Sequence, residues 1–435
     1  MILIYSAFLS ERLKYILDEV FVNRLDIDYK HTSSMDYFSA SQTFKLNYNN
    51  EISEGCVNIP ATNFLYEEDL FIQNIEVEKS TEWTSLFFQQ PYKEIPDFKL
   101  TTKFLSFDIF AAMFYLLSRY EEYLPSDKDE HNRYKETNCL AYKNDFLEIP
   151  LIDFWILRLK EILKNQYPLI NFKAPVFKQV NSIDVDFAYK YIGLSAVRLG
   201  AKAIGSLWRG KWDQQTLETP EHDPYDTYEQ MIQMAAVNKV ETIFFFLLAD
   251  YGGFDKGHSP DSPIFIKLIK HLSEHFICGI HPSYKSFVQE TLLEKELSLF
   301  HSLTSRKATI SRNHFLKIKL PETYSQLCKF NIEKDYSMGY SNHAGFRAST
   351  SFPFRFFNLI TNKETALWIQ PVCVMDVTLK NAWNMDPATA INKIHELKNT
   401  VKSVDGEFVS IWHNSSFDEE EGWLGWDKVY ESLFN

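Results

Sequence analysis

The sequence of 435 residues is poor in several residues that build common functional sites. Its five cysteines lie far apart and include no Cys-x-x-Cys pair, so we expect neither a zinc ribbon nor a disulfide framework, but buried thiols in a reducing compartment. Only 14 residues are glycine, which leaves little material for glycine-rich phosphate loops. The formal net charge of −13 argues against a general nucleic-acid binder, because such binding needs a concentrated basic face.

Long apolar runs are also missing. No uncharged stretch approaches the roughly 20 residues that cross a bilayer, and the apolar start of the chain stops at Glu11 and Arg12 without the features of a secretory leader. We therefore expect a cytoplasmic protein with no transmembrane segment. Aromatic residues, by contrast, make up 16% of the chain and hydrophobic residues 45%, which is enough for a large core.

Hydrophobic patterning predicts two domains. Residues 1–172 are expected to form a small α/β accessory domain, with a buried strand at residues 2–5 and an amphipathic helix that begins after Ser10. In residues 173–435, strand-like segments alternate with helical patterns, which indicates parallel β-α units. The predicted strands are residues 176–184, 241–249, 276–281, 308–312, 366–376 and 407–413, and the predicted helices are residues 225–238, 263–275, 290–303, 322–330 and 387–401.

Two carboxylates stand at the end of the first of these strands. Asp184 and Asp186 are two residues apart, and parallel barrels carry their chemistry at this edge. One carboxylate could bind a cation while the other takes a proton from a bound water. The alternative is an acidic loop that caps the next helix or is merely solvated.

Histidine and arginine follow other predicted strands. His281 precedes a Pro-Ser turn and is placed to bind a metal through a ring nitrogen, or to make an ordinary hydrogen bond. Arg312, followed by His314, could hold a catalytic carboxylate with two hydrogen bonds or form a structural salt bridge. His413, next to Trp412, could serve as a general acid or as a structural hydrogen-bonding group.

The order of these strand-end residues resembles the polysaccharide deacetylase superfamily (NodB homology, carbohydrate esterase family 4-like). The resemblance runs from residue 176 to residue 435. The segments SRYEE (residues 118–122), GIHPSY (279–284) and GFRAST (345–350) resemble a divergent bacterial branch with an extra N-terminal domain. The resemblance implies an α/β fold: a distorted (β/α) barrel of about seven parallel strands preceded by a small α/β domain. It also implies a metal-dependent hydrolase that removes N- or O-linked acetyl groups from a sugar or polysaccharide precursor.

The resemblance also implies catalytic roles for individual residues. Asp184 matches the general base, and Arg312 resembles the arginine that orients this base. His413 resembles the general acid, and Asp376 is the nearest candidate for the carboxylate that orients it.

The implied cofactor is a divalent metal, zinc with cobalt or nickel as alternatives. Asp186 and His281 match two metal ligands, although the family's motif has adjacent aspartates where this chain has an intervening valine. The family's second histidine, four residues after the first, is replaced here by Lys285, whose ammonium could supply part of the cation's charge. His314 could complete the ligand set, as could Ser286 or a water molecule.

The implied partner is an acetylated sugar or polysaccharide precursor, with Tyr284, Trp412 and Arg347 as candidate substrate-binding residues. A different class of function stays open: a catalytically degenerate deacetylase-like scaffold that binds a glycan or a protein partner. Lys285 and the insertions at residues 191–221 and 336–357 favour this alternative. The sequence identifies neither the glycan nor the oligomeric state.

Overall fold

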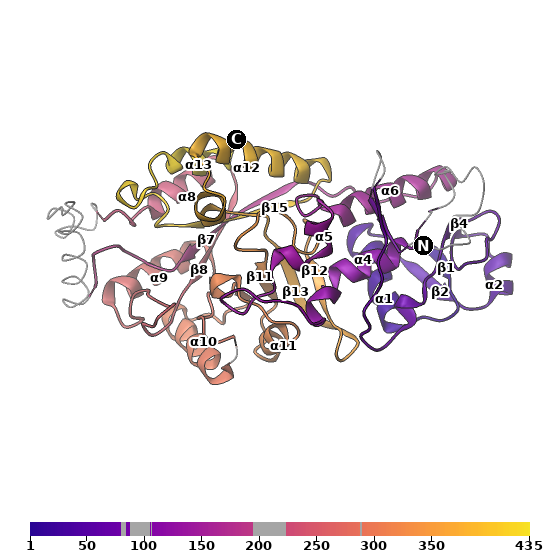
Figure 1. Ribbon diagram of the computed structural model, residues 1–435, viewed down its shortest axis with the longest axis horizontal. Helices are drawn as coiled ribbons and strands as arrows, with labels where there is room; N and C mark the ends of the chain where they lie inside the picture. The colour runs from indigo at the N-terminus through magenta and orange to yellow at the C-terminus, as the bar shows by residue number, and fades with distance from the viewer. Residues whose placement is uncertain (80–83, 88–104, 106, 195–222, 288) are drawn as a thin grey trace. The chain divides into compact units, whose positions relative to one another are not determined.

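The computed structural model describes residues 1–79, 84–87, 105, 107–194, 223–287 and 289–435, so most of the insertion at residues 191–221 lies outside the described residues. The chain forms two compact units (Figure 1). The first consists of Met1–Phe177, Phe346–Trp368 and Ser403–Gly406, and the second of Lys178–Gly345, Ile369–Lys402 and Glu407–Asn435. Each unit is described by itself below.

The first unit contains a four-stranded parallel sheet in the order β2-β1-β3-β4. The predicted strand at residues 2–5 is confirmed as β1, and Ser10 caps the following helix by accepting the Leu13 N–H at 3.0 Å. The strands of this unit are β1 (Ile2–Tyr5), β2 (Tyr29–Thr32), β3 (Phe44–Tyr48), β4 (Val57–Ile59), the antiparallel pair β5 (Val77–Lys79) and β6 (Thr84–Leu86), and β12 (Phe354–Asn358). Its helices are α1 (Glu11–Leu17), η1 (Asp18–Arg24), α2 (Met35–Ala40), η2 (Asn63–Tyr66), α4 (Ile109–Leu117), η3 (Tyr120–Tyr123), η4 (Glu136–Asn138), α5 (Leu140–Lys143) and α6 (Leu151–Gln166).

The SRYEE and GFRAST segments meet in the first unit as a buried ion-pair cluster. Arg347 binds the Glu122 carboxylate with two hydrogen bonds, from Nε at 2.9 Å and from Nη2 at 2.5 Å. Arg119 donates to Glu122 at 2.8 Å and to Glu121 at 3.0 Å. All four side chains are buried, so the carboxylates neutralise two guanidinium groups that water does not solvate.

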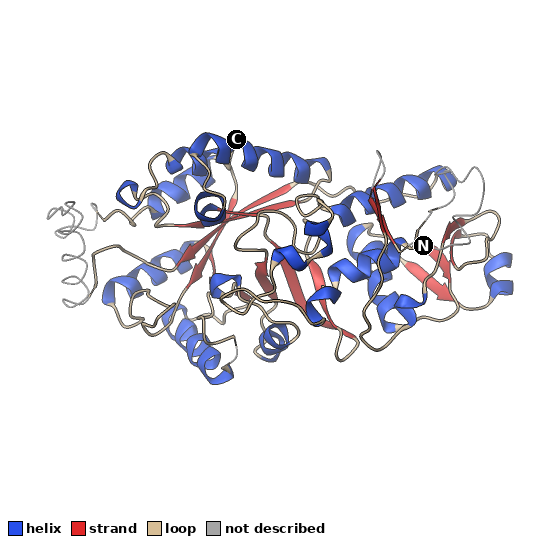
Figure 2. Ribbon diagram, viewed as in Figure 1, coloured by secondary structure: helices blue, strands red, loops and turns tan. Residues whose placement is uncertain are grey.

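The second unit is built on parallel strands whose carboxyl ends share one edge. The strands β11-β10-β9-β8-β7-β15-β14 are hydrogen-bonded in this order with parallel pairing, and β13 lies next to β11. Their bounds are β7 (Lys178–Val185), β8 (Glu241–Phe246), β9 (Ile277–Ile280), β10 (Ile310–Ser311), β11 (Lys334–Met338), β13 (Lys363–Pro371), β14 (Val374–Met375) and β15 (Glu407–His413). The sheet is therefore a curled half-barrel, and a full barrel of parallel strands is not confirmed (Figure 2).

Two features of this sheet differ from the sequence expectation. The predicted strand at residues 366–376 is broken, because the Val372 N–H donates to Met338 O and the Cys373 N–H to Val409 O, which carries the chain from β11 across to β15. Strand β11 lies partly within the segment interpreted as an insertion at residues 336–357. Its Asp335 and Ser337 are buried polar residues, so the segment lacks the apolar pattern of a core strand.

The helices of the second unit are α8 (Tyr228–Val237), α9 (Pro263–His275), α10 (Glu290–Thr304), the short η7 (His314–Leu316), α11 (Glu322–Lys329), η8 (Thr378–Ala382), α12 (Pro387–Ser403), η9 (Glu419–Glu421) and α13 (Trp426–Ser432). The five predicted helices of this unit correspond to α8, α9, α10, α11 and α12 within a few residues, whereas η7, η8, η9 and α13 were not predicted. Within the described ranges, no helix has the length and apolar character needed to cross a membrane.

Removal of the Glu122 charge should destabilise the first unit in a pH-dependent way. Burial would raise the pKa of Glu122, but Arg347 and Arg119 outweigh it and lower the pKa from 4.5 to about 2. The ionised carboxylate therefore stabilises the folded state above pH 4.5, and this contribution is lost as the pH falls toward 2. Glu122→Gln should cost about 3 kcal/mol at pH 7 and less at pH 3.5, measured by urea denaturation.

The matched control is Glu130→Gln, since the Glu130 side chain is 75% exposed. It should leave the free energy of unfolding unchanged within about 0.5 kcal/mol at both pH values. An equal loss of stability for Glu122→Gln at pH 7 and pH 3.5 would contradict the assigned role of the charge.

Candidate metal centre

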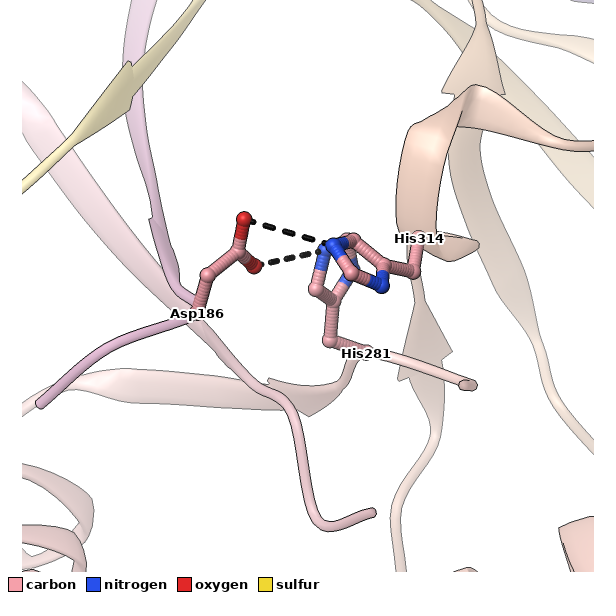
Figure 3. A group of neighbouring side chains, drawn as sticks. All are labelled: Asp186, His281 and His314. Atoms are coloured by element: carbon pink, nitrogen blue, oxygen red, sulfur yellow. Dashed lines mark ion pairs between the residues drawn. The ribbon is translucent and has the colours of Figure 1, made fainter. Parts of the chain in front are cut away.

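Three side chains from three strand ends converge on one point of the second unit. Asp186 directly follows β7, His281 follows β9, and His314 lies two residues beyond Arg312 after β10. Asp186 Oδ1 is 3.2 Å from His281 Nε2, and Asp186 Oδ2 is 3.4 Å from His314 Nε2 (Figure 3). Each residue offers one ligand atom, and these atoms all lie within 4.8 Å of one another.

This donor set fits a divalent metal such as zinc. Imidazole nitrogen and carboxylate oxygen bind zinc at about 2.0–2.1 Å, so neighbouring ligands of a tetrahedral ion lie about 3.3 Å apart. The separations of Asp186 from His281 and His314 are close to that value. In addition, Asp186 Oδ1 is buried and accepts no hydrogen bond from the described residues. A buried carboxylate oxygen in that state is suited to a cation.

Both histidines are held by their other ring nitrogen. His281 Nδ1 is hydrogen-bonded to the Arg312 carbonyl oxygen, and His314 Nδ1 lies 2.9 Å from Asp255 Oδ1. An acceptor at Nδ1 keeps the ring proton there and leaves the Nε2 lone pair available. The His314 backbone N–H also donates to the Pro282 carbonyl at 3.0 Å, which ties the loop after β10 to the loop after β9.

A carboxylate and a guanidinium form a buried pair beside these ligands. Arg312 is fully buried and donates from Nη1 to Asp184 Oδ1 at 2.6 Å, from Nη2 to Ser182 Oγ at 2.6 Å and from Nε to the Tyr336 carbonyl at 3.1 Å. The second oxygen of Asp184, Oδ2, is 3.8 Å from His281 Nε2. Asp184 therefore has one oxygen engaged by Arg312 and the other facing the ligand group.

A third histidine, His413 at the end of β15, approaches the Asp186 carboxylate. His413 Nε2 is 3.7 Å from Asp186 Oδ2, while His413 Nδ1 lies 2.9 Å from Asp376 Oδ1. Asp376 is fully buried and also accepts the His413 backbone N–H at 2.8 Å. The seven predicted catalytic and metal-site residues thus lie together, namely Asp184, Asp186, His281, Arg312, His314, Asp376 and His413.

The electrostatics of the site favour positive charge. Burial would raise the pKa of Asp186, but the His314 and His281 imidazoles hold this pKa well below its ordinary value. Burial would likewise lower the pKa of His314, yet Asp186 and Asp255 raise it to about 9. Against the same effect of burial, Asp376 and Asp186 raise the pKa of His413 to about 10. The buried carboxylates therefore need positive charge beside them, as protonated imidazole or as a cation.

The three predicted substrate-binding residues have different surroundings. Tyr284 is partly exposed near the site and stacks on Phe254, with ring centroids 4.1 Å apart. Trp412 is 1% exposed and packs against Tyr430, with ring centroids 5.1 Å apart. Arg347 belongs to the first unit, in the buried ion pair with Glu122 described above. Of the three, Tyr284 is therefore the partly exposed one at the candidate site, with its ring between Phe254 and the Lys317 ammonium.

Lys285 does not supply charge to the site. It is exposed, and no ion pair joins it to Asp184 or Asp186 in the described structure. The side chain at position 285 is therefore turned to solvent, and His314 from the loop after β10 lies beside Asp186. Ser286, a further candidate ligand, donates its hydroxyl hydrogen to the Ser283 carbonyl at 2.9 Å.

Two residues of the site escaped sequence reasoning. Asp255, the partner of His314, and Gly257 belong to the loop at residues 250–260, which follows β8. A Cβ atom on Gly257 would stand 2.5 Å from the Asp186 carbonyl oxygen, so this position has no room for a side chain. The sequence shows Asp255 only as a carboxylate in a loop after a predicted strand. Its partner His314 is 59 positions away, and spacing alone does not identify such a distant partner.

Comparisons with known proteins match the N-terminal part of the chain to a family model and the chain to a solved structure. Residues 2–168 match the model of a family of unknown function (DUF7033). No curated protein matches the chain. One similar solved structure is described as "Crystal structure of putative polysaccharide deacetylase from Mycobacterium smegmatis"; it is 12% identical, with a TM-score of 0.38, and the match covers 60% of this chain and 87% of that one.

Gly257→Ala should disturb the candidate metal centre. The added methyl group must push the loop away from the Asp186 carbonyl, which shifts this ligand and strains the packing by about 1–3 kcal/mol. We expect a lower thermal midpoint and weaker Zn²⁺ binding in a competition titration. Gly253→Ala is the matched control, since a Cβ atom there meets nothing within 4 Å. Equal Zn²⁺ affinity in the two variants would contradict the close approach of Gly257 to Asp186.

Proposed function

We propose that this protein is a metal-dependent hydrolase that removes N- or O-linked acetyl groups from a sugar or a polysaccharide precursor. The observation that carries the proposal is the position of Asp184 and His413 beside the Asp186–His281–His314 group, at 3.8 Å and 3.7 Å from its atoms. Each of the two has its own charged partner. The positions of Asp184, Asp186 and His281 are consistent with the roles that the deacetylase resemblance implies. His314 lies beside Asp186 in addition, while Lys285 is exposed.

In this proposal Asp186, His281 and His314 hold the divalent ion, with zinc as the first candidate and cobalt or nickel as alternatives. A bound divalent ion supplies Lewis acidity, which polarises the acetyl carbonyl and makes water more acidic. Three protein ligands leave a coordination position open, as catalytic zinc sites require.

Asp184 is the proposed general base. Arg312 holds its Oδ1, so Oδ2 is the oxygen left to accept a proton from the attacking water. The guanidinium is itself fixed by Ser182 and the Tyr336 carbonyl, which keeps the carboxylate in one orientation.

His413 is the proposed general acid. Asp376 holds Nδ1, and the raised pKa of His413, about 10, keeps the ring protonated near neutral pH. The proton on Nε2 is therefore available for the leaving amine or alkoxide oxygen. The side chain remains 14% exposed, so solvent can restore this proton.

The ring of Phe254, which stacks on Tyr284, is the proposed sugar-binding surface. The Tyr284 ring itself lies between Phe254 and the Lys317 ammonium, whose Nζ is 3.6 Å from the Tyr284 ring centre. Phe254 is 47% exposed, and Phe315 packs edge-on against both rings. Phe315 directly follows His314, and their ring centroids are 4.6 Å apart. A sugar ring on this surface would therefore lie close to the ligand group.

Asp184→Asn should remove acetate release. Loss of the base should lower kcat by about 10²–10⁴-fold on N-acetylated amino-sugar oligosaccharides or O-acetylated sugars, measured as free acetate. Because the change also leaves Arg312 without a charged partner, some loss of stability is expected, and folding must be checked by circular dichroism at the assay temperature. Zn²⁺ affinity should stay within a few-fold of the wild type, since Asp184 is not a proposed ligand.

Asp250→Asn serves as the matched control, because the Asp250 side chain is 74% exposed and pairs with Lys295. It should retain wild-type acetate release. Acetate release by folded Asp184→Asn at the wild-type rate would exclude Asp184 as the base, and absence of acetate release from every substrate by wild-type protein loaded with metal would favour the glycan-binding scaffold.

The wild type should bind one Zn²⁺ per chain after purification without chelators. His281→Ala and His314→Ala should each weaken binding by at least about 10-fold, because each removes a nitrogen ligand. Metal content by mass spectrometry and affinity by chelator competition measure this. His301→Ala, on α10 and exposed, is the control that should bind normally. Full affinity in His314→Ala would remove His314 from the ligand set.

A further inference from the structure

We propose that Asp255 is a positioning residue that makes His314 a metal ligand. This inference rests on the metal centre of the proposed function and goes beyond it, since it assigns the source of the second histidine and the residue that orients it. The loop after β8, at residues 250–260, would then hold no ligand of its own but would determine the orientation of one.

The contact between the two side chains is buried and direct. Asp255 is 6% exposed and His314 is 7% exposed, and Asp255 Oδ1 is 2.9 Å from His314 Nδ1. The same carboxylate oxygen accepts the Tyr284 backbone N–H at 2.9 Å. Asp255 therefore contacts the loops that follow both β9 and β10, in addition to lying on the loop after β8.

The chemical effect of this contact is specific to one nitrogen. With its proton held at Nδ1 by a carboxylate, the His314 ring presents the Nε2 lone pair on the side of Asp186, 3.4 Å away. A carboxylate at this position also increases the electron density of the ring and so strengthens its bond to a metal. His281 has a carbonyl oxygen in the equivalent position, which is a weaker acceptor than a carboxylate.

The loop is held against the site by its backbone. Gly257 lies against the Asp186 carbonyl with no room for a Cβ atom, and the Gly252 N–H donates to the Asp255 carbonyl at 2.6 Å. The hydrogen bond from Gly252 is internal to the loop, whereas the contact of Gly257 places the loop directly against Asp186. The position of the Asp255 carboxylate is therefore defined relative to Asp186 as well as to His314.

The test measures metal affinity and not turnover. Asp255→Ala should weaken Zn²⁺ binding by about 10–100-fold in chelator competition, the usual loss for a residue that orients a ligand. Asp250→Ala, in the same loop and 74% exposed, should stay within twofold of the wild type. Asp255→Asn, which keeps an acceptor oxygen without the charge, should lie between wild type and Asp255→Ala.

A double-mutant cycle separates positioning from general structural support. If Asp255 acts through His314, then Asp255→Ala added to His314→Ala should cause no further loss of affinity. The absorption of bound Co²⁺ should change alike in the two single variants, because both lose the same nitrogen ligand. If Asp255→Ala does not fold, Asp255→Asn takes its place in the cycle.

Two results would overturn the inference: affinity of Asp255→Ala within twofold of the wild type, or a loss that persists undiminished in the His314→Ala background. Its failure is distinct from failure of the proposed function. If the Asp255→Ala and His314→Ala losses of Zn²⁺ affinity are coupled but the protein never releases acetate, the positioning role is supported and the hydrolase is rejected. If the wild type releases acetate but Asp255→Ala binds Zn²⁺ with unchanged affinity, the hydrolase is supported and the positioning role is rejected.

Discussion

The second unit depends on one buried guanidinium. Arg312 donates to Asp184 and Ser182 on β7 and to the Tyr336 carbonyl on β11, and its charged end lies 4.5 Å from the centre of the Phe245 ring on β8. A fully buried guanidinium is costly unless every contact is present, so this set constrains the relative position of the strands that carry it. The same contacts hold Asp184 in its position beside His281.

The site also follows a common rule for its histidines. His281, His314 and His413 each give Nδ1 to an oxygen acceptor and turn Nε2 toward Asp186 or Asp184. The acceptors differ: a carbonyl for His281 and carboxylates for the other two. Against the effect of burial, the surrounding carboxylates raise the pKa of His314 to about 9 and the pKa of His413 to about 10. The acceptor alone does not separate the proposed roles, because His314 and His413 both have carboxylate partners. The two rings differ in position, since His314 lies on the loop after β10 and His413 at the end of β15.

The sequence predicts strands of buried apolar residues well and strands that contain buried polar residues less well. The strands β8 and β15 are apolar runs or end in recognisable motifs, and they were predicted close to their observed bounds. Strand β11 is not evident from the sequence because it contains the polar residues Asp335 and Ser337. Asp335 accepts a hydrogen bond from the Ser311 hydroxyl, and Ser337 Oγ accepts one from the Asn313 backbone N–H. His314 was one of several open choices, since its approach to Asp186 depends on the turn after β10, where Phe315 adopts a left-handed φ of 62°.

The position of His314 determines which strand ends a metal bound to the Asp186–His281–His314 group would join. Two histidines four residues apart on one loop would link the loop after β9 to Asp186 alone. His281 and His314 instead lie on separate loops, so with Asp186 the ligand set spans the ends of β7, β9 and β10. Binding free energy then stabilises the arrangement of three strand ends at once. Such a site needs the loops fixed before the ion arrives, and the Asp255–His314 hydrogen bond and the Gly257 contact with Asp186 meet that requirement.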